Sequence, residues 1–316
     1  MVDNLTQAGA AEGPLDRLKA LLPARLRGAP VVPVVRLSGV IGAVTPLRPG
    51  LTLAGVAKML ERAFAMRNAK AVALVINSPG GSPVQSRQIY LRIRQLAAEK
   101  KLPVLVFVED VAASGGYIGA IAADHIVAQQ SSLVGSIGVL FQYPNVSELL
   151  KTIGVKVEEV KSSPLKAAPN GYEPTSPEAR AALDALVKDS YAWFRGLVKD
   201  RRGMDDALLE KVADGRVFTG RQAIELKLID ELGDEKTAVA WLVANKNVKK
   251  DLPVRDYKLV PRFGDLTFLR TATSLVLNAV GLSGIAHQIE QAGVVQAVDR
   301  LGLDGMLALW TPAAGN

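Results

Sequence analysis

Cysteine is missing from this chain of 316 residues. Its absence excludes disulfides, thiolate zinc sites, iron-sulfur clusters and a cysteine nucleophile. Histidine is scarce as well: only His125 and His287 are present, so a histidine-rich metal centre or an imidazole base must use one of these two. We therefore expect no metal and no cofactor, and we look for the chemistry among Ser, Thr, Lys, Asp and Glu.

Aromatic residues account for only 5% of the chain, although the formal net charge is +7. A basic chain suggests nucleic acid as a partner. Here the basic pairs, 100–101, 201–202 and 249–250, are far apart in the sequence, and no aromatic residues alternate with a basic cluster to form a stacking platform. We therefore expect no nucleic-acid partner.

Long apolar runs are also missing near the N-terminus, so the sequence predicts no cleavable secretion signal. Residues 14–27 instead form a short basic helix pattern with leucines on one side, which suits an anionic membrane surface. Residues 271–289 carry no formal charge, but polar side chains dilute this run and favour a helix on the membrane or in an oligomer over a span. We expect a chain that is cytoplasmic or attached to the membrane only peripherally. The alternative is that both segments pack on the protein.

From residue 31 onward, apolar strand-like runs alternate with amphipathic helices. The strands are predicted at 31–37, 71–77, 102–110 and 125–129, and the helices at 51–66, 83–99, 113–123 and 177–212. This alternation predicts an α/β fold with a mostly parallel sheet that helices cover on both faces. We expect three regions, an amphipathic N-terminal extension (1–30), one α/β domain (31–245) and a C-terminal helical extension (246–316).

Two glycine-rich turns stand where chemistry is expected. The sequence NSPGG at 77–81 follows a predicted strand, and its backbone amides before a helix suit an oxyanion. The sequence ASGGY at 113–117 opens a helix, so that Ser114 stands at a strand-to-helix corner with the amide of Gly115 beside it. This is the arrangement of a nucleophile elbow. An ordinary turn and a helix cap are the competing interpretations.

A serine nucleophile needs a base. His125 lies at the far end of the predicted helix that Ser114 begins, roughly 16 Å away at 1.5 Å per residue, which is too far. His287 has no carboxylate close by in the sequence. Lys166 stands in a neutral stretch of Ser, Pro, Ala and Leu, where removal from water would favour loss of its proton. We predict that Lys166 is the general base.

Four motifs follow one another in the chain, INSPGG (76–81), ASGGY (113–117), GSIGV (135–139) and GRVFTGRQAIELKLIDELG (215–233). Together they resemble the SppA-type signal peptide peptidases, a family of serine proteases with the Clp protease and crotonase fold. The resemblance covers about residues 31–243. Four motifs in this order are far more specific than any one of them.

This resemblance implies a role for several residues. Ser114 corresponds to the nucleophile and Lys166 to the base of a Ser-Lys dyad, and Ser136 to the serine that holds the lysine amine. The amides expected to form the oxyanion hole are those of Gly80, Gly81 and Gly115. The family further implies a homo-oligomeric ring. Two arrangements of the dyad stay open in it: the lysine of one chain reaches the serine of a neighbour, or both residues belong to the same chain. Its substrates would be signal-peptide remnants and other hydrophobic peptides.

Lys227 departs from this pattern, because the family usually has glycine at this position. If the backbone is left-handed there, the lysine side chain costs roughly 1 to 2 kcal/mol of stability. Such a cost concerns the local turn and not catalysis.

Two other functions remain compatible with the sequence. A crotonase-type acyl-CoA enzyme shares the expected fold and polarises a thioester with the same kind of backbone amides. Such an enzyme has no use for the set formed by Ser114, Ser136 and Lys166. The second alternative is a catalytically idle scaffold at a membrane, in which the ends of the chain do the work.

Overall fold

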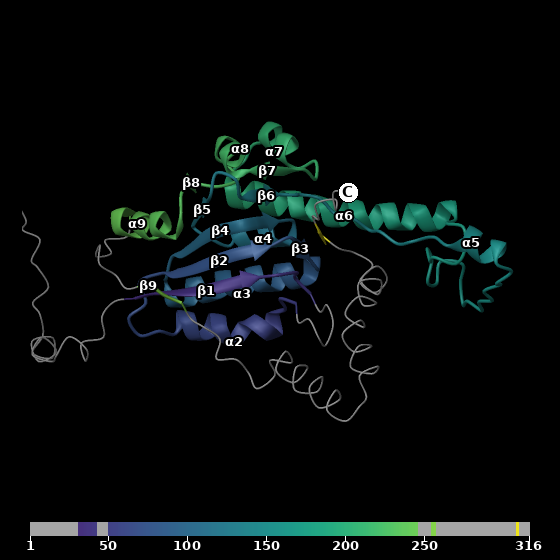
Figure 1. Cartoon of the computed structure of the whole chain (residues 1–316), viewed down its shortest axis with the longest axis horizontal. Coiled ribbons are helices and arrows are strands. Elements are labelled where there is room, and N and C mark those ends of the chain that lie inside the picture. Colours follow the sequence, from purple (N-terminus) through teal and green to yellow (C-terminus); the bar gives the residue numbers. More distant parts are fainter. Residues whose placement is uncertain (1–30, 43–49, 246–253, 257–307, 310–316) are drawn as a thin grey trace, which may run out of the picture.

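The computed structural model of the chain describes residues 31–42, 50–245, 254–256 and 308–309. Figure 1 shows a central sheet with helices packed on it, and a long arm that projects from this body at the end of one helix. The predicted N-terminal extension at 1–30, the charge-free segment at 271–289 and His287 lie outside the described residues. Within the described ranges, no helix has both the length and the apolar character that crossing a bilayer requires.

The main sheet is mostly parallel, as the sequence predicts. Its order is β7-β6-β4-β2-β1-β9, and β5 pairs with β4 and β8. Of the pairs formed in it, β6 with β7 is antiparallel and the others are parallel. The strands are β1 (Val32–Ser38), β2 (Val72–Ser78), β4 (Val104–Ala113), β5 (His125–Ala128), β6 (Leu133–Gly135), β7 (Val217–Thr219), β8 (Glu231–Leu232) and β9 (Val254–Asp256).

Helices occupy the connections. They are α2 (Leu53–Phe64), α3 (Pro83–Lys100), α4 (Gly115–Ala120), α5 (Ser147–Thr152), α6 (Pro177–Arg202), α7 (Asp206–Val212), α8 (Gly220–Glu225) and α9 (Glu235–Asn245). The single helix expected at 177–212 is two helices, because Gly203 adopts a left-handed conformation (φ 57°) and ends α6. Ser176 caps the start of α6, accepting a hydrogen bond from the Ala179 amide.

Apolar side chains fill both faces of the sheet, which explains why the strands read as nearly continuous apolar runs. On one face a large cluster joins β1, β2 and β4 to α2, α3, α4 and α6. On the other face a smaller cluster includes Val34, Val75 and Phe107, together with Ala238 and Leu242 of α9. The layers therefore hold β4 at the centre of the domain, with its carboxyl end free to carry a site.

Strand β4 changes its neighbour along its length. Residues 105–108 pair with β5, whereas residues 111–113 pair with β6. At the changeover the hydroxyl of Ser132 lies 3.2 Å from the carbonyl oxygen of Val108 and 2.5 Å from that of Glu109. This buried serine therefore satisfies carbonyls where the ladder is interrupted, and β4 delivers Ser114 beside the end of β6.

The described parts of residues 246–316 are both strands that pair with the domain. β9 lies parallel to β1, at the edge of the main sheet. β10 (Ala308–Leu309) lies antiparallel to β3 (Gly80–Gly81), the short strand formed by the glycines of the first glycine-rich turn. The other residues of this region, where helices are expected, lie outside the described ranges.

Lys227 has a left-handed backbone (φ 56°), which is the condition under which the sequence predicts a cost. We expect Lys227→Gly to raise the free energy of unfolding by about 1 kcal/mol, because glycine carries no side-chain penalty at this φ. The hydrogen bond from Arg202 to the Lys227 carbonyl, 2.7 Å long, involves only the backbone of residue 227 and should survive. Urea denaturation measures the change.

The control for this prediction is the same substitution in a regular helix. Lys188 lies within α6 with a side chain that is 75% exposed. Lys188→Gly should lower the free energy of unfolding by about 1 kcal/mol, since glycine is a poor helix former. A loss of stability in both variants would show that the left-handed turn at 227 is not strained by lysine.

Candidate active site

Ser114 forms a strained, buried corner between β4 and α4. Its φ of 54° and ψ of −119° lie in a region that non-glycine residues rarely adopt, at a cost of about 1 to 3 kcal/mol. The residue is 1% exposed, and its side chain makes no capping hydrogen bond to α4. Its amide donates to the Gly135 carbonyl over 2.8 Å. The corner is therefore held by backbone pairing, while the hydroxyl is not used as a helix cap.

The first turn of α4 packs against the SPGG turn too closely for any side chain. A Cβ added to Gly115 would lie 2.3 Å from the Ser86 hydroxyl oxygen and 3.2 Å from the Gly81 nitrogen. A Cβ added to Gly116 would lie 2.4 Å from the carbonyl oxygen of Ser78. The two glycine-rich turns, which are far apart in the sequence, thus meet at one point, and Gly81 and Gly115 are neighbours there.

The amides of Gly80 and Gly81 have different surroundings. The Gly80 amide donates to the Ser78 hydroxyl over 3.2 Å. The Gly80 carbonyl accepts from Ile41, and the Ser82 amide donates to the Ile41 carbonyl, each over 2.8 Å. Because backbone groups alternate between the two edges of a strand, the amide and carbonyl of Gly81 face the opposite edge. Gly81 therefore presents its amide beside Gly115, whereas Ser78 already holds the amide of Gly80.

Ser136 follows β6 at the position next to Ser114. Ala113 pairs with Gly135 in a parallel register, so residues 114 and 136 are the next positions along the two strands. Ser136 is 7% exposed and also has a positive φ, 52°. Its amide donates to the Arg216 carbonyl over 2.8 Å. The structure thus brings together Ser114, Ser136 and the glycines predicted for the oxyanion hole.

Polar contacts anchor helix α4, and the sequence analysis did not assign them. The Tyr117 hydroxyl donates to the Leu228 carbonyl over 2.8 Å. Burial raises the pKa of Tyr117 far above its usual value, so this donor stays protonated. Arg201 of α6 donates to the carbonyls of Ile121 and Ala123 just beyond α4, over 2.8 and 2.7 Å. Of the two residues that donate these hydrogen bonds, Tyr117 is the one that belongs to a motif, ASGGY, recognised in the sequence.

Lys166 lies in the arm, which we define as residues 141–176. Its side chain is exposed, and its amide donates to the Ser163 carbonyl over 3.0 Å. Figure 1 shows α5, which belongs to the arm, beyond the outer end of α6 and far from α4. No hydrogen bond joins Lys166 to Ser114 or Ser136 in the described part of the chain. The removal from water expected for Lys166 is therefore not present within a single chain.

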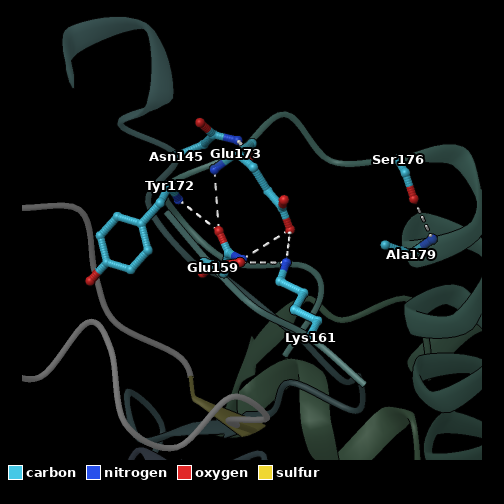
Figure 2. Close-up of polar contacts among 8 residues, drawn as sticks. Asn145, Glu159, Lys161, Tyr172, Glu173, Ser176 and Ala179 are labelled. Carbon is cyan, nitrogen blue, oxygen red and sulfur yellow. Dashed lines mark hydrogen bonds and ion pairs between the residues drawn. The ribbon is translucent and has the colours of Figure 1, made fainter. Parts of the chain in front are cut away.

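Charged contacts give the arm its own internal structure. Lys161 lies between the carboxylates of Glu159 and Glu173, 2.5 Å from each (Figure 2). The hydrogen bonds that Lys161 donates to these two carboxylates, that to Glu159 first, raise its pKa above the usual value. The Asn170 amide group donates to Glu173 over 3.0 Å. Lys161 is therefore held protonated, so it is unsuited to act as a base.

The arm is also unusually apolar on its outside. Exposed large apolar side chains in it are Leu149, Ile153, Val155, Val157, Val160, Leu165 and Tyr172. Exposed apolar side chains that gather in one patch mark an interaction site in soluble proteins. The arm thus has a surface suited to burial by another chain, and Lys166 stands next to Leu165 in it.

His125 has partners of its own, away from Ser114. Its ring stacks on Trp241 of α9 with 4.5 Å between centroids, and its Nε2 lies 3.0 Å from a Glu231 carboxylate oxygen. This agrees with the expectation that His125 does not serve Ser114. Among the described residues, no group of His, Asp and Glu side chains is arranged to hold a metal ion.

Comparison with known proteins gives the domain a family. Residues 96–249 match the model of peptidase family S49. Over 204 residues, 65% of this chain and 33% of the relative, the chain is 31% identical to Protease 4 of Haemophilus influenzae. It is 32% identical to the chloroplastic serine protease SPPA of Arabidopsis thaliana, over 82% of this chain and 38% of that protein.

A third relative has a different name. A Brucella melitensis protein named Na(+)/H(+) antiporter NhaA is 48% identical over 219 residues, which make up 69% of this chain and 30% of that protein. The chain spans less than half the length of each of these three relatives. The residues that match the S49 family model, 96–249, include the Ser114 corner and the strands β4 and β6 beside it. Residues 96–249 therefore match a peptidase domain of family S49, and the chain is similar to proteases of the SppA type.

Proposed function

We propose that this domain is a serine endopeptidase of the Clp protease and crotonase fold, which cleaves signal-peptide remnants or other hydrophobic peptides through a Ser114 acyl-enzyme. The observation that carries the proposal is the corner at Ser114, where φ is 54° and α4 packs on Gly81. Strain of this kind persists where function requires it and the surroundings hold it. The family match gives independent support.

The geometry suggests how the reaction proceeds. An extended peptide would lie along the edge of β3 opposite Ile41, with its scissile carbonyl next to Ser114. The serine oxygen attacks the carbonyl carbon while a base takes the hydroxyl proton, and the amides of Gly81 and Gly115 donate to the oxyanion. The proton then passes to the leaving amine. Water hydrolyses the resulting ester by the same route and frees Ser114.

Lys166 serves as the base in this proposal, and it comes from a neighbouring chain. The support is that Lys166 is exposed on an arm whose outer surface is apolar, while Ser114 is buried in the body. A second copy that covers the arm would take the amine out of water and favour its neutral form. A head-to-tail contact of this kind, repeated, closes into a ring. Ser136 would orient the amine beside Ser114.

Other activities fit the site less well. A crotonase-type acyl-CoA enzyme would use the backbone amides at Gly81 and Gly115, but it gives no reason for strain at Ser114. An idle scaffold does not explain why Ser114 keeps its hydroxyl in a strained corner without a capping role. We do not propose ion antiport, because the match covers only 30% of the Brucella melitensis protein that bears that name.

A fluorophosphonate probe tests the nucleophile, because it phosphonylates activated serines only. We expect the full chain to be labelled at Ser114, and Ser114→Ala to remain unlabelled. The matched control is Ser132→Ala, which removes another buried serine whose hydroxyl bonds backbone carbonyls. This variant should still be labelled at residue 114. Tryptic mass spectrometry locates the adduct, and labelling of the Ser114→Ala chain at full level would overturn the assignment.

A further inference from the structure

A buried serine of α3 lies against the first turn of α4, and the proposed mechanism does not use it. The side chains that α3 buries are those of Ser86, Ile89, Tyr90, Ile93, Leu96 and Ala97. These positions recur at the spacing of one packed helix face, which is normally apolar. Ser86 is the small polar residue of this face, the first after Gly81, and it is completely buried. A buried polar side chain in such a place calls for an explanation.

The helix does not need the Ser86 hydroxyl. The Ser82 carbonyl accepts the regular helix hydrogen bond from the Ser86 amide over 3.0 Å, and the Ser86 hydroxyl donates to the same carbonyl over 2.8 Å. A second bond of this kind adds little to helix stability. It does fix the direction of the hydroxyl, because a serine has a single hydrogen to donate. The Ser86 oxygen is therefore held in one place and is not available as a nucleophile.

The Ser86 oxygen lies against the backbone of Gly115. A Cβ added to Gly115 would lie 2.3 Å from this oxygen and 3.2 Å from the Gly81 nitrogen. The Ser86 oxygen, the Gly115 Cα and the Gly81 nitrogen therefore meet in one small volume. The proposed mechanism assigns the amides of Gly81 and Gly115 to the oxyanion. Such donors act only where they reach the developing charge at about 2.7 to 3.1 Å, so their placement decides the rate.

We propose that Ser86 is a positioning residue of the oxyanion hole, whose oxygen sets how closely the first turn of α4 approaches the start of α3. This inference rests on the proposed function, which assigns the two glycine amides to the oxyanion. Ser86 touches no substrate and acts through Gly115. Packed structure partly collapses into the space that removed atoms leave. In Ser86→Ala the turn at Gly115 therefore shifts toward α3, and its amide leaves the position from which it donates.

Kinetics of the full-length Ser86→Ala chain test this role. We expect kcat for an apolar fluorogenic peptide to fall about 10-fold and KM to change less than about twofold, because an oxyanion hole binds the transition state more than the bound peptide. Labelling of Ser114 by a fluorophosphonate should slow about 10-fold as well, since its phosphonyl oxygen needs the same donors. A role in stability alone would leave both rates of the folded chain unchanged, and that result would overturn the inference.

The matched control is Gln85→Ala, in the same turn of α3. The Gln85 side chain accepts a hydrogen bond from the Leu53 amide of α2 over 2.8 Å, so its loss loosens α3 on the side of α2. Gln85→Ala should be less stable in urea and keep kcat and the labelling rate. An equal fall of kcat in the two variants would overturn the inference, because the effect would then come from any loosening of α3.

A double substitution tests the contact between Ser86 and Gly115. The φ of Gly115 is not positive, so an added Cβ is opposed by its neighbours, first of all the Ser86 oxygen. Gly115→Ala should therefore lose fluorophosphonate labelling. Adding Ser86→Ala should restore the rate at least about 10-fold, because the new methyl group takes the space of the lost oxygen. Full labelling of Gly115→Ala, or no gain in the double variant, would overturn the inference.

Urea denaturation gives a readout that does not depend on hydrolysis. Gly115→Ala should lower the denaturation midpoint more in the chain that keeps Ser86 than in the Ser86→Ala chain. Equal shifts would overturn the inference, whatever the activity. If the shifts differ but no chain is labelled or hydrolyses peptides in a Ser114-dependent way, the placement of Gly115 by Ser86 stands and the proposed function fails.

Discussion

Chains that carry Ser114→Ala or Lys166→Ala alone are expected to hydrolyse an apolar fluorogenic peptide at least about 10³-fold more slowly than the unmodified chain, since nucleophile and base act as a unit. Mixed before assembly, the two inactive chains should recover about a quarter of the normal activity, because random mixing places an intact lysine arm next to an intact serine at that fraction of head-to-tail contacts. Recovery is expected only if the site is shared between chains.

The control for this experiment is another lysine of the arm. Lys156 is exposed, as Lys166 is, and it lies outside the 163–168 turn. Lys156→Ala should keep nearly full activity alone, which separates loss of the base from loss of arm charge. Wild-type turnover by either single variant would disprove the dyad. Two inactive variants that gain nothing on mixing would favour a dyad contained in one chain.

Gly81→Ala is expected to lower both the stability of the chain and the reactivity of Ser114. The residue has φ 146°, and an added Cβ would lie 1.9 Å from the Ile41 carbonyl oxygen, so the strand must move. Gly39→Ala is the matched control, because Gly39 also has a positive φ, 106°, but its Cβ would meet nothing within 4 Å. The control therefore measures the backbone cost alone.

We expect Gly81→Ala to lower the free energy of unfolding by about 2 to 3 kcal/mol more than Gly39→Ala does, which is the cost of forcing an extra group into packed structure. Urea denaturation compares the two variants. Fluorophosphonate labelling should be lost in Gly81→Ala and kept in Gly39→Ala, because only the first displaces the amide beside Ser114. Equal losses in the free energy of unfolding would mean that β3 moves at little cost, contrary to the close contact between Gly81 and Ile41.

Much of the fold follows from local patterns. The apolar runs at 71–77 and 125–129 predict strands whose ends agree with those of β2 and β5 to within one residue. The agreement arises because strands buried on both faces need continuous apolar sequence. The corner at Ser114 was also predictable, since Ser-Gly-Gly after a strand is typical of a tight turn, where glycine permits conformations and close contacts that other residues do not. The match of four motifs then identified the family that the comparisons confirm.

Other features depend on contacts that a local pattern does not encode. The pairing of Ala308 with Gly81 leaves no trace in the sequence around either residue. The neutral surroundings of Lys166 suggested a buried amine, but neighbours in sequence do not determine exposure, and the side chain is exposed in the single chain. Gly203 ends α6 with a φ that the apolar spacing of 177–212 does not reveal. The assigned catalytic roles of Ser114 and Lys166 stay predictions until tested.

The polar contacts of the arm lie mostly within the arm and not between the arm and the sheet. Its described polar contacts, such as those of Lys161 with Glu159 and Glu173 and that of Tyr143 with Thr175, join arm residues to one another. A segment built this way can lengthen, shorten or change its surface without disturbing the backbone around Ser114. The surface that the arm presents can therefore change in evolution without a change in the backbone that holds the corner.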